Sequence, residues 1–173
     1  LRELAFELGE TLEYKVTSAG QETAKLILQA KERKRIKEID TLVLTATVSS
    51  VSSANRPFAL SDSVIARVNP ETLAPQTSET KFAGQLAPFS QSITFDPRTG
   101  AVTAGAPRTD SPMGTHTLLS LIYAMRSFNL KPSKNLNAPV NDTRVAVFWN
   151  DKTYIFVLRP NDIDMITING EKV

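Results

Sequence analysis

The side chains that could support nucleophilic catalysis lie around the only histidine of the chain. His116 could serve as a base, and Asp110, Ser111 and Thr115 lie nearby in the sequence. A common type of Ser–His–acid hydrolase carries its nucleophile in a Gly-x-Ser-x-Gly turn, and this signature is absent. A histidine beside hydroxyl groups is commonplace, and an enzyme would need a cleft that gathers His116 and carboxylates. We therefore expect no catalytic residues, a protein that is not an enzyme, and no cofactor.

Metal chemistry is limited by the composition. Because there is no cysteine, disulfides, thiolate zinc sites, iron–sulfur clusters and cysteine nucleophiles are excluded. With one histidine, a metal site would consist mainly of carboxylates and would suit calcium or magnesium. Residues 161–164, Asn-Asp-Ile-Asp, lack the glycine and the final glutamate of a calcium loop. We interpret them as a turn and expect no metal site.

The bulk composition is that of a globular chain. The 173 residues fit a single domain, 1–173, with 41% hydrophobic and 22% charged residues. The net charge of +2 does not indicate a nucleic-acid partner, and no apolar run reaches the roughly 18 residues of a membrane span. The most charged run, residues 31–38, has no aromatic residue for base stacking. It favours a solvated hairpin tip over a patch that binds nucleic acid or membrane headgroups.

Alternation of polar and apolar residues predicts antiparallel β-strands on both sides of one helix. The turn signals are Gly20 and the sequence Asp96-Pro-Arg-Thr-Gly100. The predicted strands are 10–16, 23–31, 41–51, 63–68, 76–82, 90–95, 101–104, 143–149, 153–159 and 164–168, with turns at 18–21, 69–72, 96–100 and 150–152.

The clearest hairpin consists of residues 143–149 and 153–159. Val145, Val147 and Trp149 share one face, and bulky residues also occupy the other face. We therefore expect this hairpin to be central in a sheet rather than at its edge. Because Trp149 shares a face with Val145 and Val147, we expect its side chain to pack in the core. The alternative is that Trp149 is exposed and forms a platform for a ligand.

The helix is predicted at about residues 117–128. Apolar residues cover most of its circumference, and the remaining strip is small rather than charged. Such a helix is expected to be largely buried, with a curved or barrel-like antiparallel sheet wrapped around it. The small strip consists of Thr117, Ser120, Ala124 and Ser127.

Two further expectations concern side chains of this helix. Arg126 is its one charged residue, and burial would require a carboxylate or carbonyl partner. The helix is either a core element or a lid over an apolar cavity. As a lid, it would place Tyr123, Met125 and Phe128 around a ligand site of several hundred Å³, the usual volume of such sites.

The end of the chain predicts an open strand edge. Asn169-Gly170 is a strong hairpin signal, yet few residues follow it before Val173. We expect that the returning strand is missing, so that either the chain continues beyond this point or another molecule completes the edge. The sequence begins at Leu1 rather than methionine. Removal of a signal peptide would account for that, as would a sequence that starts partway along a longer chain. Residues of the unpaired strand that would contact a partner are Asp164, Ile166 and Ile168.

Five short motifs occur in the order of a known family. Gly9-Glu-Thr-Leu-Glu-Tyr-Lys-Val16 resembles its opening motif, and Leu119-Ser-Leu-Ile-Tyr-Ala-Met-Arg126 resembles its helix. On these motifs, within residues 9 to 135, the chain resembles the exported bacterial proteins called domain of unknown function 3108. The other three motifs are Val68-Asn-Pro-Glu-Thr-Leu-Ala-Pro75, Phe95-Asp-Pro-Arg-Thr-Gly-Ala-Val102 and Leu130-Lys-Pro132.

The chain departs from the family at two places. Thr117-Leu118 replaces the Asp-Pro that begins the family's helix, so Thr115 or Thr117 must cap this helix instead. Ser133 replaces a glycine after the helix. The resemblance implies an exported, envelope-associated antiparallel β domain around one helix, with further strands beyond Val173. It implies no activity.

Two hypotheses on function follow. The first is a non-enzymatic periplasmic or extracellular β domain with a structural or assembly role. It would pair its open strand edge at residues 164–168 with another copy or another envelope protein. The alternative is a carrier of an apolar, lipid-like ligand, with Tyr123, Met125 and Phe128 lining the cavity.

Overall fold

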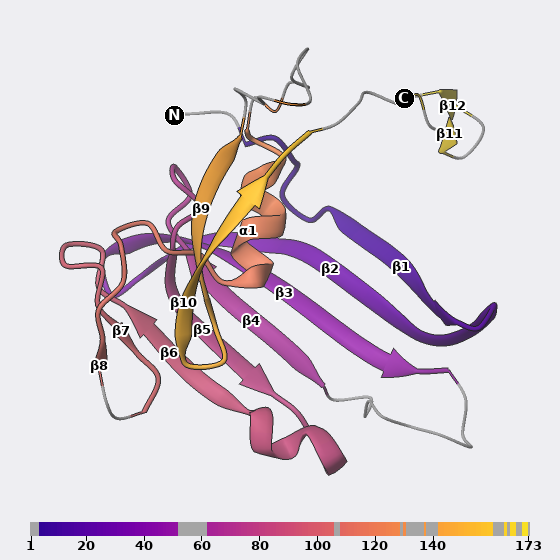
Figure 1. The fold of residues 1–173 in the computed structure, drawn as a ribbon, viewed down its shortest axis with the longest axis horizontal. Helices are drawn as coiled ribbons and strands as arrows, with labels where there is room; N and C mark the ends of the chain where they lie inside the picture. The colour runs from indigo at the N-terminus through magenta and orange to yellow at the C-terminus, as the bar shows by residue number, and fades with distance from the viewer. Residues whose placement is uncertain are drawn as a thin grey trace.

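The computed structural model describes residues 4–51, 62–105, 108–128, 130, 137, 142–160, 165, 167–168 and 171–172 (Figure 1). Among them, no helix is long and apolar enough to cross a membrane. The elements are β1 (Thr11–Ser18), β2 (Gln21–Ile36), β3 (Ile39–Ser50), β4 (Ser63–Val68), β5 (Pro75–Lys81), the 3-10 helix η1 (Gly84–Phe89), β6 (Gln91–Phe95), β7 (Val102–Thr103), β8 (Arg108–Thr109), α1 (Leu118–Met125), β9 (Thr143–Trp149), β10 (Lys152–Leu158), β11 (Thr167–Ile168) and β12 (Glu171–Lys172).

The first eight strands form one antiparallel sheet in the order of the sequence, from β1 to β8. Short hairpin turns allow this order. Ala19 and Gly20 both have positive φ between β1 and β2, and Lys37 and Glu38 do so between β2 and β3. The mainly β, antiparallel class is thus confirmed, and the charged run lies at a hairpin tip as predicted. The described strands form no closed barrel, because β1 and β8 remain the two edges of the sheet.

One face of α1 packs on the sheet. Leu119 and Tyr123 contact a cluster that includes Leu42 and Leu44 from β3 and Val68 from β4, all of them buried. These strand residues alternate with side chains on the other face, as the pleat requires. Each fully buried aliphatic side chain stabilises the fold by roughly 1.5–3 kcal/mol. The contact between α1 and the middle of the sheet is therefore the main core.

The opposite face of α1 is covered by the hairpin of β9 and β10, which crosses it in Figure 1. Leu121 packs against Val145 and Val147. The helix is therefore largely buried, as its composition predicted, and lies between two layers. That a curved sheet wraps around it stays a prediction.

The segment before α1 is joined to β9 by backbone hydrogen bonds. His116 N–H donates to Ala146 O at 2.8 Å, and Phe148 N–H donates to His116 O at 2.8 Å. Phe148 also packs edge-on against Phe95 of the large sheet, with ring centroids 6.3 Å apart. These contacts fix the second layer to the first.

Thr117 caps the helix, which confirms one of the two expected capping residues. Its side-chain oxygen accepts from Ser120 N–H at 3.2 Å, and Ser120 Oγ accepts from Thr117 N–H at 3.0 Å. Of the small strip, Thr117, Ser120 and Ala124 are buried. Ser127 is exposed, because it lies beyond the end of the helix.

Arg126 is exposed, and its partner is a carboxylate, one of the two kinds of group that its burial would have required. Its guanidinium forms two hydrogen bonds with Glu10, one of them 2.9 Å from Nη2 to Oε2, and lies 5.4 Å from the ring centre of Phe6. The pair joins the segment before β1 to the end of α1. Hydrogen bonding to Arg126 lowers the pKa of Glu10.

Replacement of Glu10 by glutamine is expected to lower the free energy of unfolding by about 1 kcal/mol at pH 7, a modest value because the pair is partly exposed. Since the folded-state pKa of Glu10 is lowered, its contribution is present above the unfolded value of 4.5 and is lost as the pH falls. Urea unfolding of both proteins at pH 7 and pH 3 checks this. A difference that persists at pH 3 would contradict it.

Three predictions about the C-terminal part need correction. The hairpin of β9 and β10 was expected to be central in a sheet, but it forms its own two-stranded sheet. Its buried face packs against α1, and no further described strands pair with it. Trp149 is 55% exposed at the end of β9, beyond the reach of the helix, so its assignment to the core was wrong. The returning strand after residues 169–170 is present as β12, which pairs with β11 through Ile168 and Glu171.

Several predicted features lie outside the described residues. These are the turn at 161–164, with Asp164 and Ile166 of the expected strand edge, and the stop after the helix at 131–134.

Candidate functional site

A row of side chains crosses the sheet on the face away from α1. Ala66 and Val68 of β4 belong to the core beneath the helix, so Arg67 between them points to the other face. Thr77 of β5 is directly opposite Arg67, and Thr94 of β6 is directly opposite Thr77. Because paired residues share a face, these three side chains form one row on three neighbouring strands.

The row lies close to one end of the sheet, where hairpin turns gather. After β4, Asn69 Oδ1 accepts from the backbone N–H groups of Glu71 and Thr72, at 2.8 and 3.2 Å. After β6, Asp96 Oδ1 accepts from Arg98 N–H at 2.9 Å. Asparagine and aspartate stabilise turns in this way. The turns predicted at 69–72 and 96–100 are confirmed.

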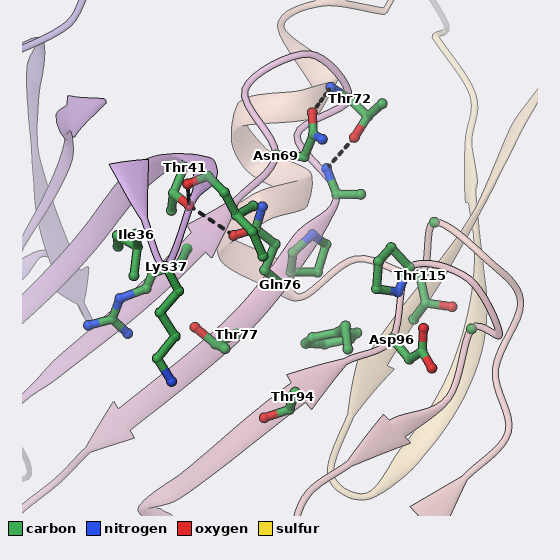
Figure 2. Close-up of a pocket in the computed structure, with 18 of the residues that line it drawn as sticks. Ile36, Lys37, Thr41, Asn69, Thr72, Gln76, Thr77, Thr94, Asp96 and Thr115 are labelled. Carbon is green, nitrogen blue, oxygen red and sulfur yellow. Dashed lines mark hydrogen bonds between the residues drawn. The ribbon is translucent and has the colours of Figure 1, made fainter. Parts of the chain in front are cut away.

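These turns and the row enclose a pocket of about 750 Å³ (Figure 2). A loop before α1 closes one side. It passes so near Gly100, whose φ is +76°, that a Cβ atom there would lie 2.0 Å from Ser111 O. Only glycine permits this approach. The residues that line the pocket are Ile36, Lys37, Ile39, Thr41, Arg67, Asn69, Thr72, Ala74, Pro75, Gln76, Thr77, Thr94, Phe95, Asp96, Pro97, Gly100, Pro112, Gly114 and Thr115.

The walls are mainly apolar, and a few polar groups have defined positions. Thr41 Oγ1 donates to Gln76 Oε1 at 3.1 Å, and Gln76 Nε2 donates to Asp40 O at 3.4 Å. The Thr77 hydroxyl oxygen is buried and has no hydrogen-bond partner among the described residues. A polar atom in this position costs free energy unless a partner arrives.

The charges in the pocket are separated. Lys37 and Arg67 line it without an ion pair to any described residue, and Arg67 is half-buried. In Figure 2, Lys37 lies on the same side as Thr77, and Asp96 lies at the other end beside Thr115. Hydrogen bonds from the turn after β6 lower the pKa of Asp96. The pocket therefore has a cationic end and an anionic end.

The residues predicted to line a ligand site are elsewhere. Tyr123 is fully buried between α1 and the sheet. Met125 and Phe128 pack beside the hairpin of β9 and β10. None of the three lines this pocket, and their role in binding a ligand stays a prediction.

The groups around His116 do not assemble as a catalytic triad. His116 Nδ1 lies 3.0 Å from Ser120 Oγ, whereas Ser111 Oγ is hydrogen-bonded to Thr153. Asp110 forms an ion pair with Arg108. Burial lowers the pKa of His116 to about 4. Within the described ranges, no three metal-binding side chains gather into a site.

Comparison of the chain with protein-family models, with curated proteins and with solved structures finds no match. The resemblance to the exported family stays a prediction. The fold and the pocket define a mainly β domain with a concave site of small-molecule size.

Proposed function

We propose that this chain is a non-enzymatic binding domain that holds a small amphipathic anion in the pocket between its hairpin turns. The observation that carries the proposal is the pocket itself. Its volume of about 750 Å³ falls within the usual range of ligand sites, roughly 300–1,000 Å³. Its apolar walls and few polar groups are also typical of such sites.

The charges support an anionic ligand. An unpaired, half-buried guanidinium is costly, and a carboxylate, sulfonate or phosphate at Arg67 would give it the partner that the described residues lack. Lys37 adds a second cation on the same wall. The hydroxyl of Thr94, which is exposed in the same row, can donate to the same anion. The apolar part of the ligand would then pack against Phe95 and the prolines.

The proposal includes an exported location, periplasmic or extracellular, in a bacterium. The resemblance in the motifs from Gly9 to Pro132 is what supports it. Fractionation of the source cells with an antibody against this domain tests the location. Recovery in the cytoplasmic fraction would refute the exported location and would leave the proposed binding site untested by this experiment but intact.

Two fluorescent probes of similar size test the pocket. The anion 1-anilinonaphthalene-8-sulfonate is expected to bind the folded domain more tightly than the neutral N-phenyl-1-naphthylamine. Arg67→Gln is expected to raise the dissociation constant of the anionic probe by about tenfold, which corresponds to one charge-assisted hydrogen bond. It should leave the dissociation constant of the neutral probe unchanged. Thr94→Trp, which fills the pocket from an exposed position, should abolish binding of both probes.

Arg144→Gln is the matched control, because it makes the same change of charge on an exposed residue of β9. It should leave both titrations unchanged. Thermal unfolding of each variant establishes that it is folded. The proposal is wrong if the two pocket variants bind both probes as the unaltered protein does.

A further inference from the structure

The β1 strand is an edge of the large sheet. It pairs with β2 on one side, and no described strand pairs with its other side. Figure 1 shows β1 at the rim of the sheet, and its hairpin with β2 extends away from α1. An edge strand presents backbone N–H and C=O groups that can pair with another strand.

The face of β1 that continues the core is apolar and partly exposed. Leu12 pairs with Leu28 and Tyr14 pairs with Leu26, so these side chains share the face that carries α1. Tyr14 is 46% exposed, and Val16 on the same face is 38% exposed. A further strand beside β1 would cover both side chains.

The opposite face of β1 carries Glu13 and Lys15. Within the chain, Lys15 is directly opposite Lys25, an unfavourable pairing of like charges. Lys25 Nζ lies 2.9 Å from Glu13, and Lys15 Nζ lies 3.8 Å from Glu22. Lys15 therefore lacks a directly opposite acidic partner.

A second copy of β1 supplies that partner in one register. When two antiparallel strands pair about Tyr14, Glu13 of each copy is directly opposite Lys15 of the other. Leu12 is then opposite Val16, and the two Tyr14 side chains are neighbours. A lysine on an edge usually opposes pairing. In this register, the lysine is complementary to the same strand of another copy.

We infer that β1 is a self-association surface, where two copies of the chain join through antiparallel pairing centred on Tyr14. The arrangement has two-fold symmetry, so each copy contributes the same surface. The register of β1 on β2 shifts between Val16 and Thr17, where Thr23 of β2 is the extra residue, so we place the regular pairing in the segment from Leu12 to Val16. This surface is separate from the pocket, since none of its residues lines it.

Charge reversal tests the register. Glu13→Lys places two lysines opposite each other at both ends of the pair, and Lys15→Glu places two glutamates there. Each variant alone is expected to raise the dimer dissociation constant by about tenfold, because two attractive pairs become repulsive. An equimolar mixture of the two variants restores opposite charges at both positions. Fluorescence anisotropy of labelled Glu13→Lys titrated with Lys15→Glu should therefore give a dissociation constant near that of the unaltered protein.

Lys81→Glu, on the internal strand β5, controls for the change in net charge and should dimerise normally. Sedimentation equilibrium up to about 1 mM measures dimerisation of the unaltered chain. The inference is overturned if that chain is monomeric throughout. It is also overturned if the single variants dimerise unchanged, or if their mixture associates no better than either alone.

Discussion

Replacement of Tyr123 by alanine is expected to lower the free energy of unfolding by about 3–5 kcal/mol, the usual cost of removing a buried aromatic side chain. Tyr123 has no exposed surface and joins α1 to the sheet. Its ring packs edge-on against Phe6, with centroids 4.9 Å apart. The alanine variant would leave a cavity where the helix, the N-terminal segment and the sheet meet.

The phenylalanine variant separates the ring from its hydroxyl group. The Tyr123 hydroxyl is buried without a hydrogen-bond partner among the described residues, and burial raises its pKa to about 12. Tyr123→Phe removes this unsatisfied group and keeps the ring, so stability should be unchanged or higher by about 1 kcal/mol. Urea unfolding at pH 7 measures both variants. A loss in the phenylalanine variant as large as in the alanine variant would show that the hydroxyl, rather than the ring, stabilises this region.

Local patterns were sufficient to predict most of the strands. Residues 63–68 were placed correctly because alternation and the Asn-Pro turn that follows define both ends of β4. The hairpin of β9 and β10 was also predicted, to within one residue at β10, with a tight turn at Asn150 and Asp151, both at positive φ. These features depend on neighbours in the sequence, where turn chemistry and side-chain period act directly.

The surroundings of these elements were harder to predict. Bulky side chains on both faces of residues 143–149 indicated a strand in the centre of a sheet. In the structure, one face meets α1, and Phe148 on the other meets the large sheet. A sequence pattern reports that a face is covered and leaves open which element covers it. The position of Trp149 beyond the helix follows from tertiary packing and has no local signal.

The pocket was not predicted, because it depends on strand register. Arg67, Thr77 and Thr94 are adjacent only once β4, β5 and β6 pair in the observed register. One local signal was present, a single arginine between the apolar residues Ala66 and Val68. The small strip correctly predicted that the helix is largely buried. Arg126 was expected to need a carboxylate or carbonyl partner if it were buried, and in the structure it is exposed and paired with a carboxylate. Which carboxylate this is depends on the path of the N-terminal segment.

His116 should make the stability of this domain depend on pH. Burial lowers its folded-state pKa from the ordinary 6.5 to about 4. Between these values, the unfolded chain binds a proton at His116 that the folded chain does not. Stability is therefore unaffected by this group above about pH 6.5 and falls as the pH decreases toward 4. A shift of this size corresponds to about 3 kcal/mol.

The protonated His116 ring is unfavourable because the segment before α1 is buried. His116 is held between β9 and the start of α1 by two backbone hydrogen bonds, and 7% of its surface is exposed. The ring lies within hydrogen-bond distance of the Ser120 hydroxyl. Its pKa is lowered by burial, without a contribution from a carboxylate. A charge there would be desolvated without a counterion.

Comparison of the unaltered protein with His116→Asn isolates this effect from the carboxylates, which also titrate in acid. The asparagine variant is expected to be less stable at pH 7.5 by a constant amount, because it loses packing. Between pH 7.5 and pH 4.5, the unaltered protein should lose about 2–3 kcal/mol more than the variant does. Urea unfolding at both pH values measures the difference. Parallel losses in the two proteins would show that His116 is protonated in the folded state without penalty, and hence that the segment before α1 opens to water.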